Sequence, residues 1–295
     1  VHFAHQIAEN LSSRNFMEAF KGGEAAYDLM PFYRYIWVIN YIFFNEAPWI
    51  FFFILTFFPL LMYRLLINIL NEKWANVLII FWLVIPLFEA FGFFHFYYIK
   101  LTLRGFAEPL SYLLFFYSIS IILSLKKEDV FKKRSYDYFM IGLLFSIAIG
   151  LRANILPATL IFIIFLLYRN ISIKNFSNLF YLLFGLSTVL IIPYHNFAFT
   201  GEFIPLTIAA YKDWNLGASP LDYYNLILSI LSFNIDYTAL NKIYLHVSGE
   251  LKIYEVWYHI SILSCFFLLF NRNVPLVIKC FSISAISMLV MLLFY

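Results

Sequence analysis

Ionisable side chains at a regular spacing are the first feature of the sequence that could carry chemistry. Lys100, Arg104 and Glu108 recur every four residues just before Pro109. If this stretch is helical, the three side chains share one helix face and combine two cations with a carboxylate. Such a set suits a phosphate-bearing lipid substrate. The alternative is a salt-bridged stripe whose charged ends snorkel to the membrane surface.

Further polar residues stand in or beside long apolar runs, where they are costly. Glu89 lies within one such run, and Arg152 lies between two others. An ionisable group inside a membrane span costs roughly 2.5–3.5 kcal/mol, so it usually faces a cavity or a partner. We expect Pro193 to end a helix and to leave the pair His195-Asn196 at the membrane interface. An aromatic belt with an interfacial cap would have a similar sequence.

The first residues contain one pattern that could bind a metal. His2, His5 and Glu9 would lie on one face of a helix, where two imidazoles and a carboxylate could hold a divalent ion. A surface helix that faces water and lipid headgroups explains them equally well. The sequence has no phosphate-binding glycine loop, no cysteine pair at zinc spacing and no nucleophile elbow. The sequence therefore identifies no certain cofactor, and a divalent metal remains possible.

The composition identifies the kind of protein that must position these residues. Of 295 residues, 63% are hydrophobic, 22% are aromatic and 13% are charged, and the mean hydropathy is +0.82. These values exclude an ordinary soluble domain and a disordered chain, and two cysteines are too few for a disulfide-framed module. The net charge of +3 is too balanced to indicate nucleic acid. We predict an all-α polytopic membrane protein.

Apolar runs of near-spanning length predict about eight transmembrane helices, because a helix needs roughly 20 residues to cross a bilayer. The runs cover residues 47–63, 74–91, 109–125, 138–151, 153–168, 176–194, 256–270 and 280–295. Strands of a membrane barrel would instead alternate apolar and polar residues over about ten positions. The fourth and fifth runs adjoin at Arg152, where we favour a tight hairpin over a single broken element.

The basic residues assign the two sides of the membrane. Eleven of the 20 Lys and Arg residues lie in or beside four short connections. These connections surround residues 64–73, 126–134, 169–174 and 272–279. By the positive-inside rule they are cytoplasmic, and the longer segments between spans lie on the other side.

This assignment divides the chain into four parts. They are a first extracytoplasmic loop (1–46), a bundle of six spans (47–196), a second extracytoplasmic loop (197–255) and two further, truncated spans (256–295). In the first loop we expect a surface helix at the start and an extended return to the membrane over residues 27–35. In the second we expect an interfacial helix over residues 221–235.

Five short motifs occur in order along the chain. They are Tyr-x-x-Met-Pro-Phe-Tyr-Arg-Tyr (27–35), Arg-Gly-Phe-Ala-Glu-Pro-Leu (104–110), Gly-Leu-Arg (150–152), Pro-Tyr-His-Asn (193–196) and Thr-Gly-Glu-Phe-Ile-Pro-Leu (200–206). Their order resembles the GT-C glycosyltransferases, most of all the branch of protein mannosyltransferases and aminoarabinose transferases. The resemblance implies a multi-pass protein of a bacterial inner (plasma) membrane, with its active site between the first external loop and the membrane face.

The resemblance also implies a reaction. The donor would be a polyprenyl-phosphate sugar, and the acceptor a lipid, glycan or protein outside the cytoplasm. A carboxylate would act as general base on the acceptor hydroxyl, while cations neutralise the departing lipid phosphate. The catalytic candidates are Asp28 and Glu108. The resemblance and the charge spacing together give six substrate-binding candidates: Arg34, Lys100, Arg104, Arg152, His195 and Asn196.

Two further expectations concern completeness and the alternative function. Members of the family place the main base at the very start of the first loop. Because the chain begins at Val1 and stops inside an apolar run at Tyr295, we expect a part of a longer protein with this base upstream of Val1. The alternative function is a non-catalytic transporter, flippase or polysaccharide-export subunit. A transporter should have interrupted helices and midplane polar residues, whereas most ionisable residues here cluster at the outer boundary.

Overall fold

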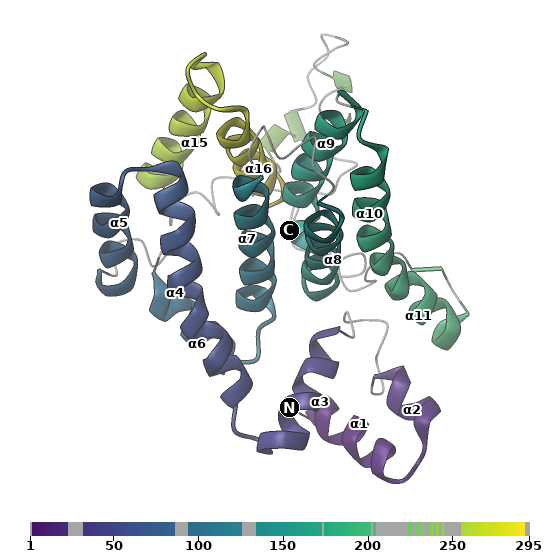
Figure 1. Cartoon of the computed structure of the whole chain (residues 1–295). Helices are drawn as coiled ribbons and strands as arrows, with labels where there is room; N and C mark the ends of the chain where they lie inside the picture. Colours follow the sequence, from purple (N-terminus) through teal and green to yellow (C-terminus); the bar gives the residue numbers. More distant parts are fainter. Residues whose placement is uncertain are drawn as a thin grey trace.

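The computed structural model describes residues 2–22, 32–85, 94–125, 134–172, 174–201, 203–204 and 255–292, with isolated residues between 224 and 244. Every regular element in these ranges is a helix, which confirms the all-α prediction for the described part of the chain. Figure 1 shows an upright bundle, with the helices of residues 2–44 grouped below one of its ends.

The two groups follow the order of the chain. The smaller group contains α1 (His2–Ser12), α2 (Phe16–Lys21) and α3 (Phe32–Phe44). The bundle contains α4 (Trp49–Ile69), α5 (Glu72–Val84), α6 (His95–Leu103), α7 (Glu108–Ser124), α8 (Ser135–Leu151), α9 (Leu156–Ser172), α10 (Phe176–Leu186), α11 (Ile191–Thr200), α15 (Glu255–Phe270) and α16 (Leu276–Leu292). Two 3-10 turns, η3 (Ala153–Ile155) and η4 (Ser187–Leu190), join α8 to α9 and α10 to α11.

The bundle has helices of membrane-spanning length. Within the described residues, three helices are long and apolar enough to cross a bilayer: Trp49–Ile69, Ala153–Ser172 and Phe176–Thr200. Shorter apolar helices cover Glu108–Ser124, Ser135–Leu151, Ile260–Phe270 and Leu276–Met288. Each of the predicted apolar runs therefore contains a helix. Only the helices Trp49–Ile69, Ala153–Ser172 and Phe176–Thr200 reach spanning length within the described residues, so the number of eight spans stays a prediction.

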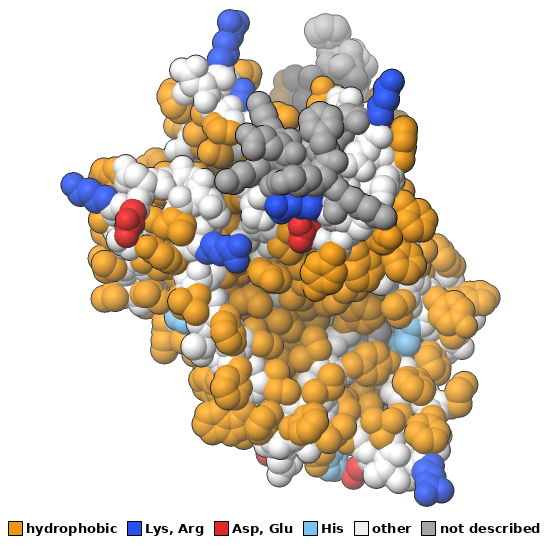
Figure 2. Space-filling view, viewed as in Figure 1, with side chains coloured by type: hydrophobic (Ala, Val, Ile, Leu, Met, Phe, Trp, Pro, Cys, Tyr) orange, Lys and Arg blue, Asp and Glu red, His pale blue; other side chains and the backbone are white. Residues whose placement is uncertain are grey.

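Large hydrophobic side chains cover the outside of the bundle. Figure 2 shows them over most of the visible face, with Lys and Arg mainly near the upper end and a few charged side chains at the lower tip. On α4 alone, Phe53, Phe57 and Leu60 are each at least 60% exposed. An apolar surface of this extent fits contact with lipid rather than with water.

The centre of the bundle is α8, which packs closely against α7 and α10. Gly142 on α8 and Gly185 on α10 face each other, and an added Cβ on either would meet backbone atoms of the other helix. Small residues permit such close approach, and in a membrane this packing is what holds helices together. On the α7 side, the buried Ser111 hydroxyl donates to the Ala148 carbonyl at 2.9 Å.

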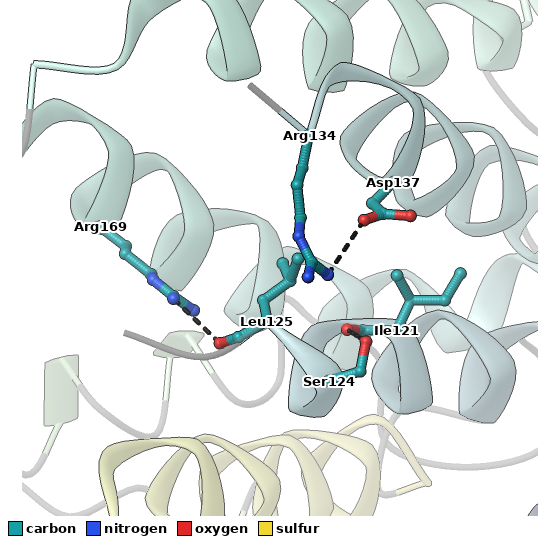
Figure 3. Close-up of polar contacts among 6 residues, drawn as sticks. All are labelled: Ile121, Ser124, Leu125, Arg134, Asp137 and Arg169. Carbon is teal, nitrogen blue, oxygen red and sulfur yellow. Dashed lines mark hydrogen bonds and ion pairs between the residues drawn. The ribbon is translucent and has the colours of Figure 1, made fainter. Parts of the chain in front are cut away.

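The chain reverses at Arg152, as predicted for a hairpin. Arg152 has an extended backbone (φ −150°, ψ 107°) that ends α8. At this end of the bundle its side chain meets Glu108, the first residue of α7. At the opposite end Arg169, in the last turn of α9, donates to the Leu125 carbonyl just after α7 at 3.0 Å (Figure 3). We call these the Glu108 end and the Leu125 end.

The first loop differs from the prediction in one respect. Its surface helix is present as α1, but residues 32–35 belong to the helix α3 and are not extended. Trp37 and Val38 of α3 are buried against Ile7 of α1, so an apolar helix face outweighed the turn signals before it. The rest of the expected extended return, residues 27–31, lies outside the described residues.

Pro193 does not end its helix, contrary to the prediction. The α10 helix passes through the 3-10 turn η4 and continues as α11 to Thr200, and it ends at Gly201 with a left-handed φ of 75°. A proline lacks an N–H and clashes with the preceding turn of an α-helix, and the local 3-10 geometry accommodates both. Glu89 lies outside the described residues, and of residues 221–235 the structure describes only isolated positions.

Candidate functional site

An ion pair between two helix ends is the centre of the candidate site. The Arg152 Nη2 atom lies 2.9 Å from the Glu108 Oε1 atom, and the two side chains are 39% and 14% exposed. The second carboxylate oxygen of Glu108 is buried and has no hydrogen-bond partner in the described part of the chain. The arginine of this pair is partly exposed, and the carboxylate has an oxygen that accepts no hydrogen bond from a described residue. Such a pair can bind a further polar group.

Helix geometry explains why these two residues meet. Glu108 stands in the first turn of α7, where the positive end of the helix dipole favours a carboxylate. Arg152 follows the last residue of the antiparallel α8, where the negative end favours a cation. The Ser111–Ala148 hydrogen bond fixes the two helices one turn away from the pair.

Lys100, Arg104 and Glu108 do not share one helix face, so that part of the prediction is wrong. The α6 helix ends at Leu103, and Gly105 follows with a left-handed φ of 80°. The N–H groups of Gly105 and Phe106 donate to the Thr102 and Leu101 carbonyls at 3.0 and 3.1 Å, which is the Schellman pattern of a helix end. Glu108 then begins a new helix.

The break leaves the two cations exposed near the Glu108 end. Lys100 lies in the last turn of α6, and Arg104 is the residue that caps it. Both are exposed, whereas Glu108 is largely buried in its pair with Arg152. The charges of the motif are thus divided between an exposed cationic turn and a neutralised ion pair.

The first loop reaches this site through Phe32 and Tyr33 at the start of α3. An added Cβ on Gly150 of α8 would lie 2.5 Å from the Phe32 ring, so this glycine allows α3 to approach the end of α8. Burial raises the pKa of the next residue, Tyr33, to about 12, and the charge of the nearby Glu108 carboxylate adds to the rise. A weak hydrogen bond between the Tyr33 phenol and the Trp37 side chain partly opposes the rise. The Tyr33 phenol is therefore neutral at physiological pH.

His195 ties α11 to the first-loop helices. Its Nε2 atom lies 2.8 Å from the Phe20 carbonyl oxygen and 3.1 Å from the Tyr35 hydroxyl. The Tyr35 hydroxyl itself donates to the same carbonyl at 2.5 Å. A carbonyl can only accept, so Nε2 carries the hydrogen in its contact with Phe20. In this structure His195 joins two segments of the protein, and a contact with substrate stays a prediction.

Arg34 and Asn196 also make structural contacts. The Arg34 guanidinium donates to the Gly22 carbonyl at 2.7 Å and lies 3.9 Å from the centre of the Phe3 ring, and the residue is 7% exposed. Asn196 is buried and donates to the Ile204 carbonyl at 2.9 Å. These contacts hold the first loop together and fix the chain after α11. The structure therefore concentrates the candidate site on Glu108 and Arg152.

The possible metal ligands of the first helix, His2, His5 and Glu9, are joined by no further ligand in the described part of the chain. His5 and Glu9 form an exposed pair at 3.6 Å. The His5 ring also packs edge-on against Tyr41 of α3. Among the residues that the structure describes, no group of three or more His, Cys, Asp and Glu side chains could hold a metal ion. Asp28, the other catalytic candidate, lies outside the described residues.

Sequence reasoning missed two residues at the Glu108 end, Tyr33 and Asn154. Tyr33 belongs to the motif of residues 27–35, in which the charged residue Arg34 was predicted to bind substrate and Tyr33 was not. Asn154 lies in η3, two residues after Arg152. Each has a buried polar atom without a hydrogen-bond partner in the described part of the chain. A polar residue directly after a predicted hairpin turn was the available signal for Asn154.

The Leu125 end has a different character. Arg134 pairs with Asp137 at 3.4 Å, and Arg169 binds the Leu125 carbonyl (Figure 3). In Figure 1 the α4–α5, α9–α10 and α15–α16 turns lie at this same end of the bundle. Arg169 binds a carbonyl at a helix end and Arg134 binds a nearby carboxylate, and both contacts stabilise helix ends.

The chain was compared with models of protein families, with curated proteins and with solved structures, and none of the three comparisons found a match. The resemblance to a glycosyltransferase family therefore depends on the five motifs alone.

Proposed function

We propose that this chain acts as a membrane glycosyltransferase similar to the GT-C enzymes, in the inner membrane of a bacterium. It would move a sugar from a polyprenyl-phosphate donor to an acceptor outside the cytoplasm. Eight helices would cross the membrane, with the Leu125 end in the cytoplasm and the Glu108 end outside. The proposal is supported by the motif order and by the basic residues of the short connections.

The observation that carries the proposal is the Glu108–Arg152 ion pair beside the first-loop helices. An incompletely hydrogen-bonded carboxylate at the end of a membrane bundle can meet a substrate whose lipid part remains in the bilayer. The exposed cations Lys100 and Arg104 lie on the preceding turn, where they could bind a phosphate at the membrane surface. The exposed cations would bind the phosphate of the donor, and the neutral ion pair would bind its uncharged sugar.

The proposed step is a displacement at the anomeric carbon of the sugar. The acceptor hydroxyl oxygen forms a bond to this carbon, and the bond between the carbon and the phosphate oxygen breaks. The polyprenyl phosphate leaves with the bonding electron pair, and Lys100 and Arg104 stabilise its added charge. The hydroxyl proton passes to a carboxylate. For Glu108 the accepting atom would be Oε2, because Oε1 is bound by Arg152.

A transfer assay tests the proposal. Membrane vesicles that contain the protein are supplied with undecaprenyl phosphate linked to labelled hexoses and pentoses, and release of undecaprenyl phosphate is measured by mass spectrometry. We expect release from at least one donor, with Arg104→Ala lowering the rate tenfold or more. The matched control is Arg64→Ala, which removes an exposed arginine from the C-terminal half of α4 and should leave the rate unchanged. The C-terminal end of α4 leads to the α4–α5 turn at the Leu125 end (Figure 1). Absence of release from every donor would contradict the proposed function.

A further inference from the structure

Several buried polar atoms at the Glu108 end have no hydrogen-bond partner in the described part of the chain. In the part of the chain that the structure describes, eleven buried side-chain nitrogen or oxygen atoms lack a hydrogen-bond partner. Four of them belong to Tyr33, Glu108, Arg152 and Asn154. Four more belong to Ser135, Asn170 and Asn178 near the Leu125 end, but only at the Glu108 end do they include members of an ion pair. Folded proteins satisfy most buried polar atoms, so these exceptions beside a charged pair need an explanation.

The chemical types of these atoms restrict the ligand that could satisfy them. Glu108 Oε2 and Asn154 Oδ1 accept hydrogen bonds, Arg152 Nε donates, and the Tyr33 hydroxyl can do both. Phosphate oxygens at neutral pH mainly accept, so a phosphate would leave both acceptors unsatisfied and would be repelled by Glu108. A hydroxyl group can both donate one hydrogen bond and accept others. The mixed set therefore matches a polyhydroxyl ligand.

The charge of the site favours the same ligand. Glu108 neutralises Arg152 at 2.9 Å, so the pair offers little net attraction to an anion. The exposed cations on the preceding turn, Lys100 and Arg104, are better placed for a phosphate. A neutral sugar gains directed hydrogen bonds from a neutralised ion pair without the cost of bringing another charge into the site.

The Tyr33 hydroxyl is suited to bind such a ligand. Its ring is held by Trp37 and Phe51, at centroid distances of 6.3 and 5.7 Å. Its pKa of about 12 keeps the phenol protonated, so it can donate to a sugar oxygen and accept from a sugar hydroxyl.

We propose that Tyr33, Glu108, Arg152 and Asn154 form a subsite for the hydroxyl groups of a carbohydrate, distinct from the phosphate-binding cations. This inference rests on the proposed function and deepens it, because it assigns the ion pair to the sugar and not to the lipid phosphate. It also gives the first loop a direct part in substrate binding, through Tyr33 of α3.

Two probes that each carry half of the donor chemistry test the subsite. The first is a set of octyl glycosides of glucose, galactose, mannose, xylose and arabinose, and the second is farnesyl phosphate. Binding to the full chain in phosphatidylcholine nanodiscs is measured by calorimetry. We expect at least one glycoside to bind and Tyr33→Phe to weaken its Kd about fivefold, the equivalent of one neutral hydrogen bond. The same variant should leave the Kd of farnesyl phosphate unchanged.

The matched control is Tyr41→Phe, which removes a hydroxyl from the same helix two turns further on. It should change neither Kd. Because the Tyr33 hydroxyl makes no hydrogen bond of good geometry with a described residue, Tyr33→Phe should change the melting temperature little. A purely structural tyrosine would instead lose stability when the hydroxyl is removed.

The outcomes separate the two proposals. Binding of glycosides that depends on Tyr33, without binding of farnesyl phosphate, supports the subsite and contradicts the proposed donor. Failure of every glycoside to bind overturns the subsite. So does an equal effect of Tyr33→Phe and Tyr41→Phe, or a Tyr33→Phe effect on farnesyl phosphate alone.

Discussion

Phe32 of α3 packs against Gly150 of α8 so closely that an added Cβ on the glycine would lie 2.5 Å from the Phe32 ring. This contact joins the first-loop helices to the bundle. The residue after Phe32 is Tyr33, and two residues after Gly150 comes Arg152, so the contact also positions both sides of the candidate site. A glycine is needed here because any larger side chain would displace the start of α3.

Substitution of Gly150 should therefore disturb the site through Phe32. We expect Gly150→Ala to lower the unfolding free energy by about 1–3 kcal/mol, the usual cost of overpacking. Phe32→Leu should recover part of this loss in the double variant, because a smaller side chain makes room for the new methyl group. Thermal unfolding in detergent measures both effects. Strictly additive losses in the double variant would contradict the contact.

A contrasting result is expected at Gly142. Its added Cβ would meet backbone atoms of α10 and not the end of a side chain. Backbone cannot move aside without shifting the whole helix, so Gly142→Ala should cost more than Gly150→Ala, and no single side-chain truncation should rescue it. The same melting experiment checks this order, and a smaller loss for Gly142→Ala would contradict the close approach of α8 and α10.

The Glu108–Arg152 pair should behave as a coupled unit in stability. Arg152→Gln leaves the largely buried carboxylate without its cation, and we expect a loss of about 1–3 kcal/mol. The double variant Glu108→Gln/Arg152→Gln should regain much of that stability while transfer activity stays low. Chemical unfolding and the vesicle transfer assay give the two readouts. Recovery of activity together with stability would show that the pair has only a structural role.

The Tyr35 contact predicts a pH dependence at high pH. Burial raises the pKa of Tyr35 from its usual 10 to about 12, with the Arg34 charge opposing the rise. The folded state thus prefers the protonated phenol, so its contribution to stability is present below pH 10 and is lost as pH rises through about 12. The melting temperature of the unsubstituted protein should fall relative to that of Tyr35→Phe over this range. Parallel curves for the two proteins would contradict this prediction.

The proposed sidedness can be tested by cysteine labelling in cells. Cys265 and Cys280 are first replaced by serine, and single cysteines are then introduced at Arg14 or Lys73, both of which are exposed. A membrane-impermeant maleimide added outside should label the Arg14→Cys variant and not the Lys73→Cys variant, because the positive-inside rule places the basic turns in the cytoplasm. The reverse labelling pattern would overturn the proposed orientation.

Much of the fold could be predicted from hydrophobic runs. The run 109–125 became α7 (Glu108–Ser124), and the reversal at Arg152 followed from two apolar runs that meet at one charged residue. The break between α6 and α7 was missed because the four-residue spacing of charges favoured a continuous helix. The left-handed Gly105 was the signal that ended it.

The candidate site was less predictable than the fold. Glu108 and Arg152 stand out in sequence because charges beside apolar runs are costly, and the structure brings them together. Arg34 and His195 have the same polar character in sequence, yet they bind the carbonyls of Gly22 and Phe20 within the protein. Residue type and spacing could not distinguish these structural contacts from a site, because the contacts join segments far apart in the chain.

The most direct test of the central claim is to look for a polyprenyl lipid that co-purifies with the protein. The protein is purified in mild detergent and its bound lipids are analysed by native mass spectrometry, beside the Arg104→Ala and Arg64→Ala variants. We expect a polyprenyl phosphate, or its sugar-linked form, on the unsubstituted protein and on Arg64→Ala, and a loss of at least tenfold on Arg104→Ala. Only bulk phospholipids, at equal levels on all three proteins, would contradict a polyprenyl-phosphate site at the Glu108 end.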